Sequence, residues 1–236
     1  MNTVDGEEAP AMMPPPSIKS INTSIKNEEE FRTYSITDTS ERVIQHYKDM
    51  RTNQTVEFYN RMENKYSFEN GAYRRLMTIR EAFVELENYI DASDPDMDLP
   101  NLLHLLQTAE GIRNAGHPDW LQLVGLLHDV GKIMFLWGDG ADGQDGYSPK
   151  GKQWALGGDT WVVGCRIPNE AVVFPEFNPL NPDMSNPQCN TKYGMYEPNC
   201  GLDELRFAWG HDEYMYRMLG ECTCDLKLNC NARCFF

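Results

Sequence analysis

Several histidines of this chain stand where they could bind a metal ion. Only five occur in 236 residues, and three of them lie in stretches with helical patterning. His104 is surrounded by leucines. His128 is followed at once by Asp129, and His211 precedes two acidic residues. Imidazole is the commonest transition-metal ligand, and a histidine buried among leucines needs a polar partner. Each alone could be a hydrogen-bonded core histidine, but the adjacent pair His128-Asp129 inside an apolar run favours a metal site.

The other two histidines, His46 and His117, have no acidic or histidine neighbour at ligand spacing. We expect His46 on the surface of a helix and His117 in a turn. Neither is included in the predicted metal site.

Hydrophobic periodicity predicts the elements that must bring the candidate ligands together. Helices are expected at residues 40–65, 78–90, 101–115, 118–136 and 202–219. Ser40 and Asn101 are suitable N-caps, and Pro118 suits the first turn of a helix. The predicted fold class is therefore all-α, a helical bundle with long loops and at most a small hairpin.

The remaining segments have loop-like compositions. Residues 1–29 are expected to form a disordered tail, because their prolines and few apolar side chains do not favour a packed core. Residues 139–146 are rich in glycine and aspartate, which predicts a mobile surface loop. Residues 152–200 are expected to be mostly loop, with short β-prone stretches at 160–163 and 171–174.

Charge and composition narrow the classes of function. Twenty-one basic against 36 acidic residues give a net charge of −15, which repels nucleic acid and anionic membrane surfaces. No apolar stretch approaches the roughly 18 residues of a membrane span, and no signal-peptide pattern is seen. An odd count of seven cysteines favours reduced thiols. We therefore expect a cytoplasmic protein that binds neither nucleic acid nor membranes.

Ordered sequence strings carry a more specific signal than the histidines alone. They are DPD at 94–96, QTAEGIR at 107–113, VGLLHDVGK at 124–132, GDT at 158–160, VGC at 163–165, GMY at 194–196 and WGHDEYMY at 209–216. In this order they closely resemble the myo-inositol oxygenase family, a branch of the all-helical, metal-binding HD-domain superfamily. The resemblance covers about residues 30 to 218, so the expected fold is HD-domain-like.

The resemblance implies a chemistry and a set of metal ligands. Members of the family use a non-haem di-iron centre, two irons per subunit, to cleave myo-inositol with dioxygen to D-glucuronate. By this likeness His104 and His128 would bind one iron, Asp129 would bridge both, and His211 would bind the other. A carboxylate has two oxygens and can span two cations. The implied partners are myo-inositol and dioxygen, and the chain is expected to be a monomer.

The same resemblance assigns residues to the substrate. The implied substrate-binding residues are Arg32, Asp91, Ala92, Ser93, Lys132, Gly158 and Asp159. Ala92 departs from the glutamate expected there, which should loosen substrate contacts. Lys132 is the expected catalytic residue, because it follows Asp129 by about one helical turn and its ammonium could reach an alkoxide held on the metal. The plainer alternative is a solvated lysine at a helix end.

The likeness stops after Leu219, which divides the chain into an expected tail 1–29, an incomplete oxygenase domain 30–219 and a cysteine-rich tail 220–236. The family continues with a further histidine on the second iron and an aspartate on the first, so the activity of this shortened chain is in question. Four cysteines in the tail, Cys222, Cys224, Cys230 and Cys234, are too closely spaced for a usual zinc site. A frameshift, retained intron or alternative exon would explain the tail better.

Two other functions remain open from the sequence. One is an HD-type phosphohydrolase, in which metal-bound hydroxide attacks a phosphate, although only Lys132 and Arg113 could form a basic cradle. The other is a non-catalytic remnant that binds metal weakly or not at all and acts by pairing with a full-length copy. Metal content and product analysis would separate the three possibilities.

Overall fold

The structure is a computed structural model that describes residues 35–67, 75–91, 100–136, 138–145, 151–221 and 233–235. The expected tail 1–29 and most of the cysteine-rich tail lie outside the described residues. So do three of the predicted substrate-binding residues, Arg32, Ala92 and Ser93.

The first predicted helix is in fact two, α1 (Glu41–Asn53) and α2 (Val56–Lys65). The side chain of Ser40 caps α1, as expected, and the side chain of Thr55 caps α2 by accepting a hydrogen bond from the Phe58 amide at 3.1 Å. Gln54 adopts φ −76° and ψ 82°, outside the helical region. The prediction of one continuous helix was wrong because the apolar periodicity continues beyond Thr55, which caps a second helix.

Helix α3 (Ile79–Leu86) begins with a capping box between Thr78 and Glu81. It ends before the predicted limit at residue 90. The preceding strand β1 (Leu76–Thr78) pairs antiparallel with β2 (Arg233–Phe235), which forms the two-stranded sheet of the described chain.

Helices α4 (Asn101–Asn114) and α5 (Asp119–Leu127) form a hairpin. The predicted cap Asn101 is instead the first helical residue, after Pro100. The predicted helix 118–136 is also interrupted, because α5 ends at Leu127 and a 3₁₀-helix, Val130–Leu136, follows. The residues between these two helices are His128 and Asp129.

Residues 152–200 are mostly irregular, as predicted. Four short 3₁₀-helices occur at Asn169–Ala171, Pro175–Leu180, Pro182–Ser185 and Leu202–Glu204. Val162 forms a single antiparallel bridge with Phe207, but residues 171–174 form no strand, since Phe174 has φ 52°. The last helix, α6 (His211–Glu221), begins nine residues later than expected at 202.

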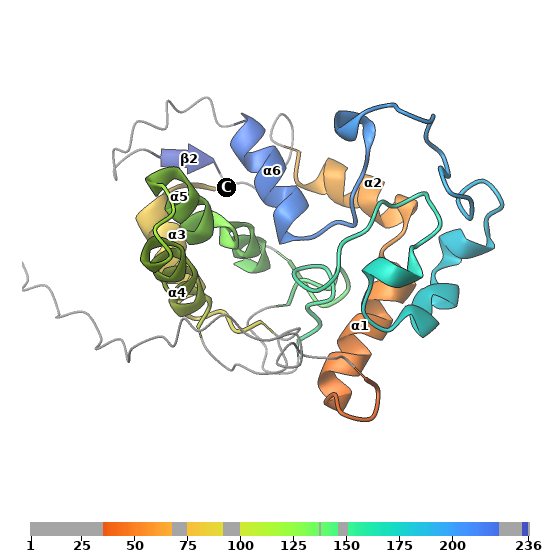
Figure 1. The fold of residues 1–236 in the computed structure, drawn as a ribbon, viewed down its shortest axis with the longest axis horizontal. Coiled ribbons are helices and arrows are strands. Elements are labelled where there is room, and N and C mark those ends of the chain that lie inside the picture. Colours follow the sequence, from red (N-terminus) through yellow and green to blue (C-terminus); the bar gives the residue numbers. More distant parts are fainter. Residues whose placement is uncertain are drawn as a thin grey trace, which may run out of the picture.

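The core joins two groups of elements. Figure 1 shows α3, α4 and α5 at one end, α1 and α2 with the long loops at the other, and α6 between them. Trp209 is fully buried just before α6 and packs on Tyr59 and Tyr66. The predicted all-α class is confirmed. Among the described residues, no helix is long and apolar enough to cross a bilayer.

Candidate metal centre

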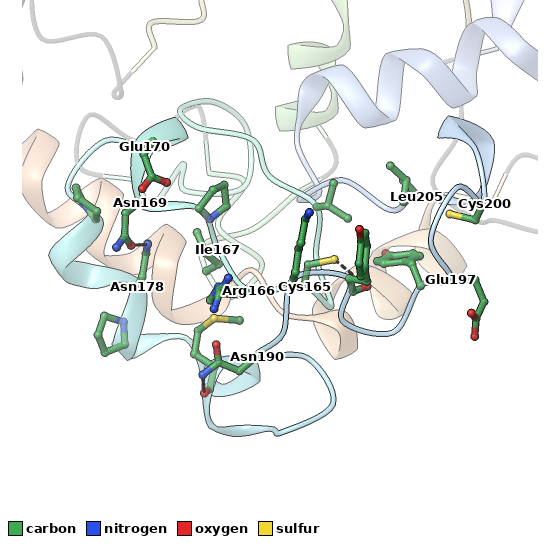
Figure 2. A pocket seen from close by; sticks show the side chains of 18 of the residues that line it. Cys165, Arg166, Ile167, Asn169, Glu170, Asn178, Asn190, Glu197, Cys200 and Leu205 are labelled. Carbon is green, nitrogen blue, oxygen red and sulfur yellow. Dashed lines mark hydrogen bonds between the residues drawn. The ribbon is translucent and has the colours of Figure 1, made fainter.

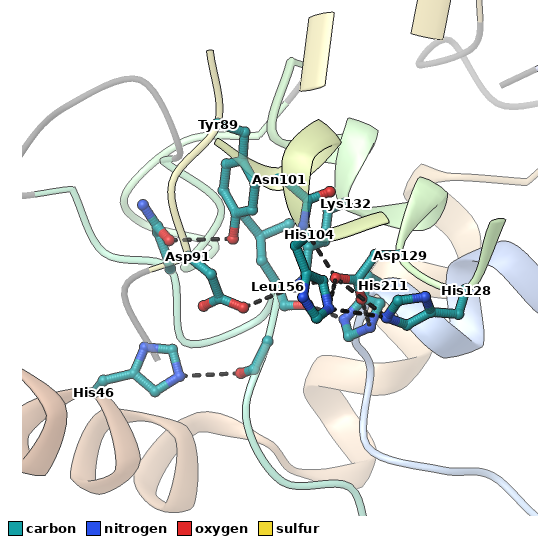
Figure 3. A network of polar contacts seen from close by, with 12 residues as sticks. His46, Tyr89, Asp91, Asn101, His104, His128, Asp129, Lys132, Leu156 and His211 are labelled. Atoms are coloured by element: carbon teal, nitrogen blue, oxygen red, sulfur yellow. Dashed lines mark hydrogen bonds and ion pairs between the residues drawn. The ribbon is translucent and has the colours of Figure 1, made fainter. Parts of the chain in front are cut away.

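Three imidazoles meet one carboxylate in the structure (Figure 3). Nε2 of His211 lies 3.0 Å from Oδ1 of Asp129. Nε2 of His104 and Nε2 of His128 lie 3.5 and 3.6 Å from the other oxygen, Oδ2, and 3.2 Å from each other. The ligand atoms of His104, His128 and Asp129 all lie within 4.8 Å of one another. The arrangement places two imidazoles at one carboxylate oxygen and one imidazole at the other.

Each of these side chains stands at a defined point of an element. His104 lies in the first turn of α4. His128 caps the C-terminus of α5, Asp129 follows it, and His211 is the first residue of α6. The prediction that all three histidines sit inside helices is therefore right for His104 and for His211, the first residue of α6, and wrong for His128. Helix ends bring the others together because the chain changes direction there.

The hydrogen bonds of two rings determine which nitrogen carries the proton. Nδ1 of His128 lies 2.7 Å from the carbonyl of Gly125, and Nδ1 of His211 contacts the carbonyl of Leu156. A carbonyl only accepts, so Nδ1 donates in both rings and Nε2 of the neutral ring carries a lone pair. A lone pair aimed at the Asp129 carboxylate requires a proton or a cation between them. This is the arrangement in which protein histidines bind metal ions, with the outer nitrogen held by a carbonyl.

The ionisation of the centre is set by burial and by close opposite charges. Burial raises the pKa of Asp129, but the hydrogen bond with His211 and the charge of Lys132 hold it well below its usual value. Burial lowers the pKa of His211, yet the hydrogen bond with Asp129 raises it overall. Asp129 is therefore an anion that attracts cations.

Lys132 is buried and forms two ion pairs. Its Nζ lies 2.7 Å from Oδ2 of Asp129 and 2.7 Å from Oδ2 of Asp91. Burial lowers the pKa of Lys132, but the charges of Asp91 and Asp129 outweigh it and raise the pKa. The alternative of a solvated lysine at a helix end is wrong, because the side chain is 6% exposed.

Two residues of the centre were not identified as such from the sequence. Nδ2 of Asn101 donates to Oδ2 of Asp129 at 3.0 Å, and its Oδ1 is buried without a hydrogen-bond partner in the described part of the chain. A Cβ on Gly131 would lie 1.9 Å from the carbonyl oxygen of His211, so only glycine allows this approach. For Gly131, the glycine in the HDVGK string was an available signal. No local sequence feature indicates that Asn101 contacts Asp129.

His46 is also placed differently from the prediction. It is 7% exposed in α1, and its Nε2 lies 3.0 Å from the carbonyl of Gly157 (Figure 3). The expectation of a surface position was wrong, because the loop 151–160 covers that side of α1. His117 is exposed after α4, as expected.

The structure brings only some of the predicted substrate residues to the centre. Asp91 reaches it through Lys132. Oδ2 of Asp159 instead accepts from Arg51 Nη2 at 2.6 Å and from the Val173 amide at 2.8 Å. Gly158, with φ +107°, packs beside His46. A cavity of about 60 Å³ is lined by Gly158, Asp159 and His211, among others, which places this loop next to the centre.

A larger hollow of about 1170 Å³ lies elsewhere, within residues 162–205 (Figure 2). The described residues that line it include none of the predicted site residues. Two free thiols, Cys165 and Cys200, are among them, and Cys189 is a third free thiol. Volume alone therefore does not identify the site; the convergent ligands do.

The mostly helical fold and the cluster of histidines around a carboxylate together indicate a helical metal-binding protein. A family model described as "Myo-inositol oxygenase" matches residues 40–232, beyond Leu219, so the chain belongs to that family.

Individual members of the family are also similar to the chain. It is 47% identical to inositol oxygenase of Mus musculus and 45% identical to that of Homo sapiens, each over 197 residues. It is 41% identical to inositol oxygenase 1 of Arabidopsis thaliana over 196 residues. These matches cover 82%, 82% and 81% of this chain but 63%, 63% and 58% of the relatives, so the chain spans less than two thirds of their length.

Proposed function

We propose that this protein is an inositol oxygenase, which cleaves myo-inositol with dioxygen to D-glucuronate at an iron centre. The observation that carries the proposal is the convergence of three imidazoles on the two oxygens of Asp129. Membership of the family supports it. The net charge of −15 is compatible with a neutral polyol and disfavours nucleic acid or an anionic membrane as partner. A cytoplasmic monomer with an HD-like arrangement is part of the proposal.

The proposed ligands divide between two irons. His104 and His128 face Oδ2 of Asp129, and His211 faces Oδ1, so the carboxylate stands between two groups of imidazoles. When bound, the two irons would supply the redox capacity to use dioxygen and the Lewis acidity to lower the pKa of substrate hydroxyls. The residues of the chain would hold and orient the polyol beside them.

Lys132 has the position and charge to act on a substrate oxygen. Its ammonium is buried beside Asp129, where a positive charge stabilises a developing alkoxide more strongly than in water. Asp91 holds the ammonium from the other side. We propose that Lys132 keeps its proton and stabilises the alkoxide, while Asp91 fixes the direction of Nζ.

The other predicted substrate residues keep their proposed role. They are Arg32, Ala92, Ser93, Gly158 and Asp159. Gly158 and Asp159 line the small cavity beside His211, which supports a position near the polyol. Oδ2 of Asp159 would have to lose its hydrogen bond from Arg51 before it could accept one from a substrate hydroxyl.

The charges of the described centre disfavour the phosphohydrolase alternative. Lys132 is already paired with both Asp91 and Asp129, so its ammonium is not available to a phosphate group. Arg113, the other candidate for a phosphate cradle, pairs instead with Glu110 on the exposed side of α4. A neutral polyol suits this centre better than a phosphate ester.

The decisive experiment combines metal content with product analysis. The protein would be loaded anaerobically with Fe(II), its iron per chain measured, and oxygen uptake and D-glucuronate followed after addition of myo-inositol. We expect two irons per chain and product formation. His211→Ala should abolish the activity, and His117→Ala, at an exposed histidine outside the centre, should not.

Three outcomes would contradict the proposal. A fully iron-loaded protein that makes no D-glucuronate would reduce the conclusion to membership of the family. Manganese-dependent hydrolysis of nucleotides without oxygen uptake would favour the phosphohydrolase. A chain that binds no iron would favour the non-catalytic remnant.

A further inference from the structure

We propose that Gln54 is a positioning residue that holds His211 in place through the backbone of Trp209. Gln54 lies at the junction of α1 and α2 and is 2% exposed. Its carboxamide forms two hydrogen bonds with one residue. Nε2 donates to the carbonyl of Trp209, and Oε1 accepts from the Trp209 amide at 2.9 Å. The inference rests on the proposed function, since it concerns the ligand of the second iron.

The two hydrogen bonds of the Gln54 side chain pair with the Trp209 backbone as a neighbouring β-strand would. Just before Trp209, the chain is already paired with the loop 161–163. The Ala208 amide donates to the Trp161 carbonyl at 2.7 Å, and Val162 bridges Phe207. This pairing ends at Ala208. The side chain of Gln54 therefore supplies the next pair of hydrogen bonds to this backbone, two residues before His211.

The buried segment before His211 borders a small cavity. The cavity of about 60 Å³ is lined by Gln54 and by residues 208–212. A cavity wall loses dispersion contacts on its open side, so packing restrains it less than a filled core would. Gly210, directly after Trp209, adds backbone freedom. Directed hydrogen bonds then have a larger share in fixing the segment.

Gln54 is itself held rigidly. Nδ2 of Asn181 donates to the Gln54 carbonyl at 2.8 Å and to the Arg51 carbonyl at 2.9 Å. A side chain that is to position another group needs its own backbone fixed, and Asn181 provides this. The end of α1 is thereby connected to the start of α6.

The connection reaches one ligand of the proposed centre and not the others. His211 follows Trp209 by two residues, and its amide and Nδ1 both contact the Leu156 carbonyl. His104 and His128 stand on the α4–α5 hairpin, which Gln54 does not contact in the hydrogen bonds of the described chain. Loss of the Gln54 carboxamide should therefore displace His211 selectively.

The test compares Gln54→Ala with Asn178→Ala. Asn178 is likewise a buried carboxamide, 6% exposed, and donates to Asn169 at 2.9 Å, away from the centre. Gln54→Glu, which keeps the shape but replaces the donor to Trp209, serves as a second variant if the alanine variant does not fold. Histidine side-chain ¹⁵N NMR of the metal-free proteins reports the tautomer of each ring, with the His211 signal assigned by His211→Gln. Anaerobic Fe(II) titration then measures the affinity of each site.

In Gln54→Ala we expect the His211 ring signals to move away from their wild-type positions, because the ring loses its fixed contacts with Leu156 and Asp129, while those of His104 and His128 stay as in the wild type. The affinity for the second iron should fall about 10- to 100-fold, as for other residues that orient metal ligands, with the first site unchanged. In Asn178→Ala neither should change. Wild-type His211 signals in both Gln54 variants, or equal changes in Asn178→Ala, would overturn the inference. A wild type that binds no iron would contradict the proposed function, whereas the NMR comparison would still test Gln54.

Discussion

The two sides of the candidate centre are built very differently. On one side, the α4–α5 hairpin carries His104 and His128, and of its helical residues only Asn101, Leu105 and Gly125 are buried. The hairpin exposes large apolar side chains, among them Leu106, Trp120, Leu123 and Val124. On the other side, six residues of the loop 151–163 and of the segment just before His211 are all buried. They are Trp154, Ala155, Leu156, Trp161, Ala208 and Trp209.

This difference extends to the ligands. The side chains of His104 and His128 are 40% and 34% exposed, against 19% for His211. His211 is therefore fixed by the core, while the other two depend on a hairpin whose contacts are largely between its own helices. A metal ion that binds the folded state stabilises most the part that is least stable without it. We infer that metal binding would stabilise chiefly the hairpin.

The largest effect is expected at the carboxylate that both sides share. Asp129→Asn removes the only charged oxygen pair among the ligands and leaves Lys132 with Asp91 alone. Both iron sites should be lost, and unfolding should cost about 3–5 kcal/mol less, as when one partner of a buried ion pair is removed. Metal analysis and urea denaturation measure the two effects.

Asp142→Asn is the matched control for Asp129→Asn. Asp142 pairs with Lys65 and Arg61 away from the centre. It should retain both irons and lose about 1 kcal/mol or less. Retention of two irons by Asp129→Asn would show that the carboxylate does not join the two sides.

Lys132→Met should separate catalysis from metal binding. The substitution keeps the volume of the buried chain but removes the ammonium beside Asp129. We expect kcat/KM for myo-inositol to fall about 10²- to 10³-fold, the usual range for losing one stabilising group at a developing anion. Iron content should stay near that of the wild type. Iron loss in proportion to activity would instead give Lys132 a structural role at the centre.

Leu105→Ala tests whether the hairpin depends on few anchors. Leu105 is fully buried, and its truncation should lower the free energy of unfolding by about 2–5 kcal/mol. The affinity of the His104–His128 site should fall more than that of the His211 site. Leu106→Ala, at a side chain 40% exposed, should cost less than about 1 kcal/mol and affect neither site. Equal weakening of both sites by Leu105→Ala would mean that the two sides are not independent.

The smallest effect concerns His46, on the well-packed side. Burial lowers its pKa below the ordinary 6.5, although Asp91, Asp49 and Asp159 raise it and the Gly157 carbonyl accepts its proton. The folded protein thus keeps His46 neutral where the unfolded chain takes up a proton. Its contribution to stability is complete above pH 6.5 and is lost as the pH falls below that value.

Urea denaturation at several pH values can measure this contribution. His46→Gln should be less sensitive to acid than the wild type between neutral pH and about pH 5, since glutamine can donate to Gly157 without titrating. His117→Gln should keep the wild-type dependence. A wild-type slope in His46→Gln would show that other groups account for the acid sensitivity.

The sequence predicted the all-α class and the side chains that meet at the centre, but not how they meet. His128 and Asp129 stood out because two polar ligands interrupted an apolar run, and that signal is local. The break at Gln54, the burial of His46 and the contact of Asn101 with Asp129 depend on segments distant along the chain. Hydrophobic periodicity contains no information about such partners. The late start of α6 has the same origin, since Trp209 and Ala208 are taken up by pairing with Gln54 and Trp161.

Gly131 determines how closely the segment after Asp129 can approach the start of α6. Since even a methyl group at Gly131 would collide with the His211 carbonyl, replacement by alanine would act as a wedge between the end of one ligand segment and the start of the other. His211 would then be pushed away from Asp129 while every coordinating side chain remained present. Gly131→Ala thus offers a way to disturb the geometry of the centre without changing the donor set.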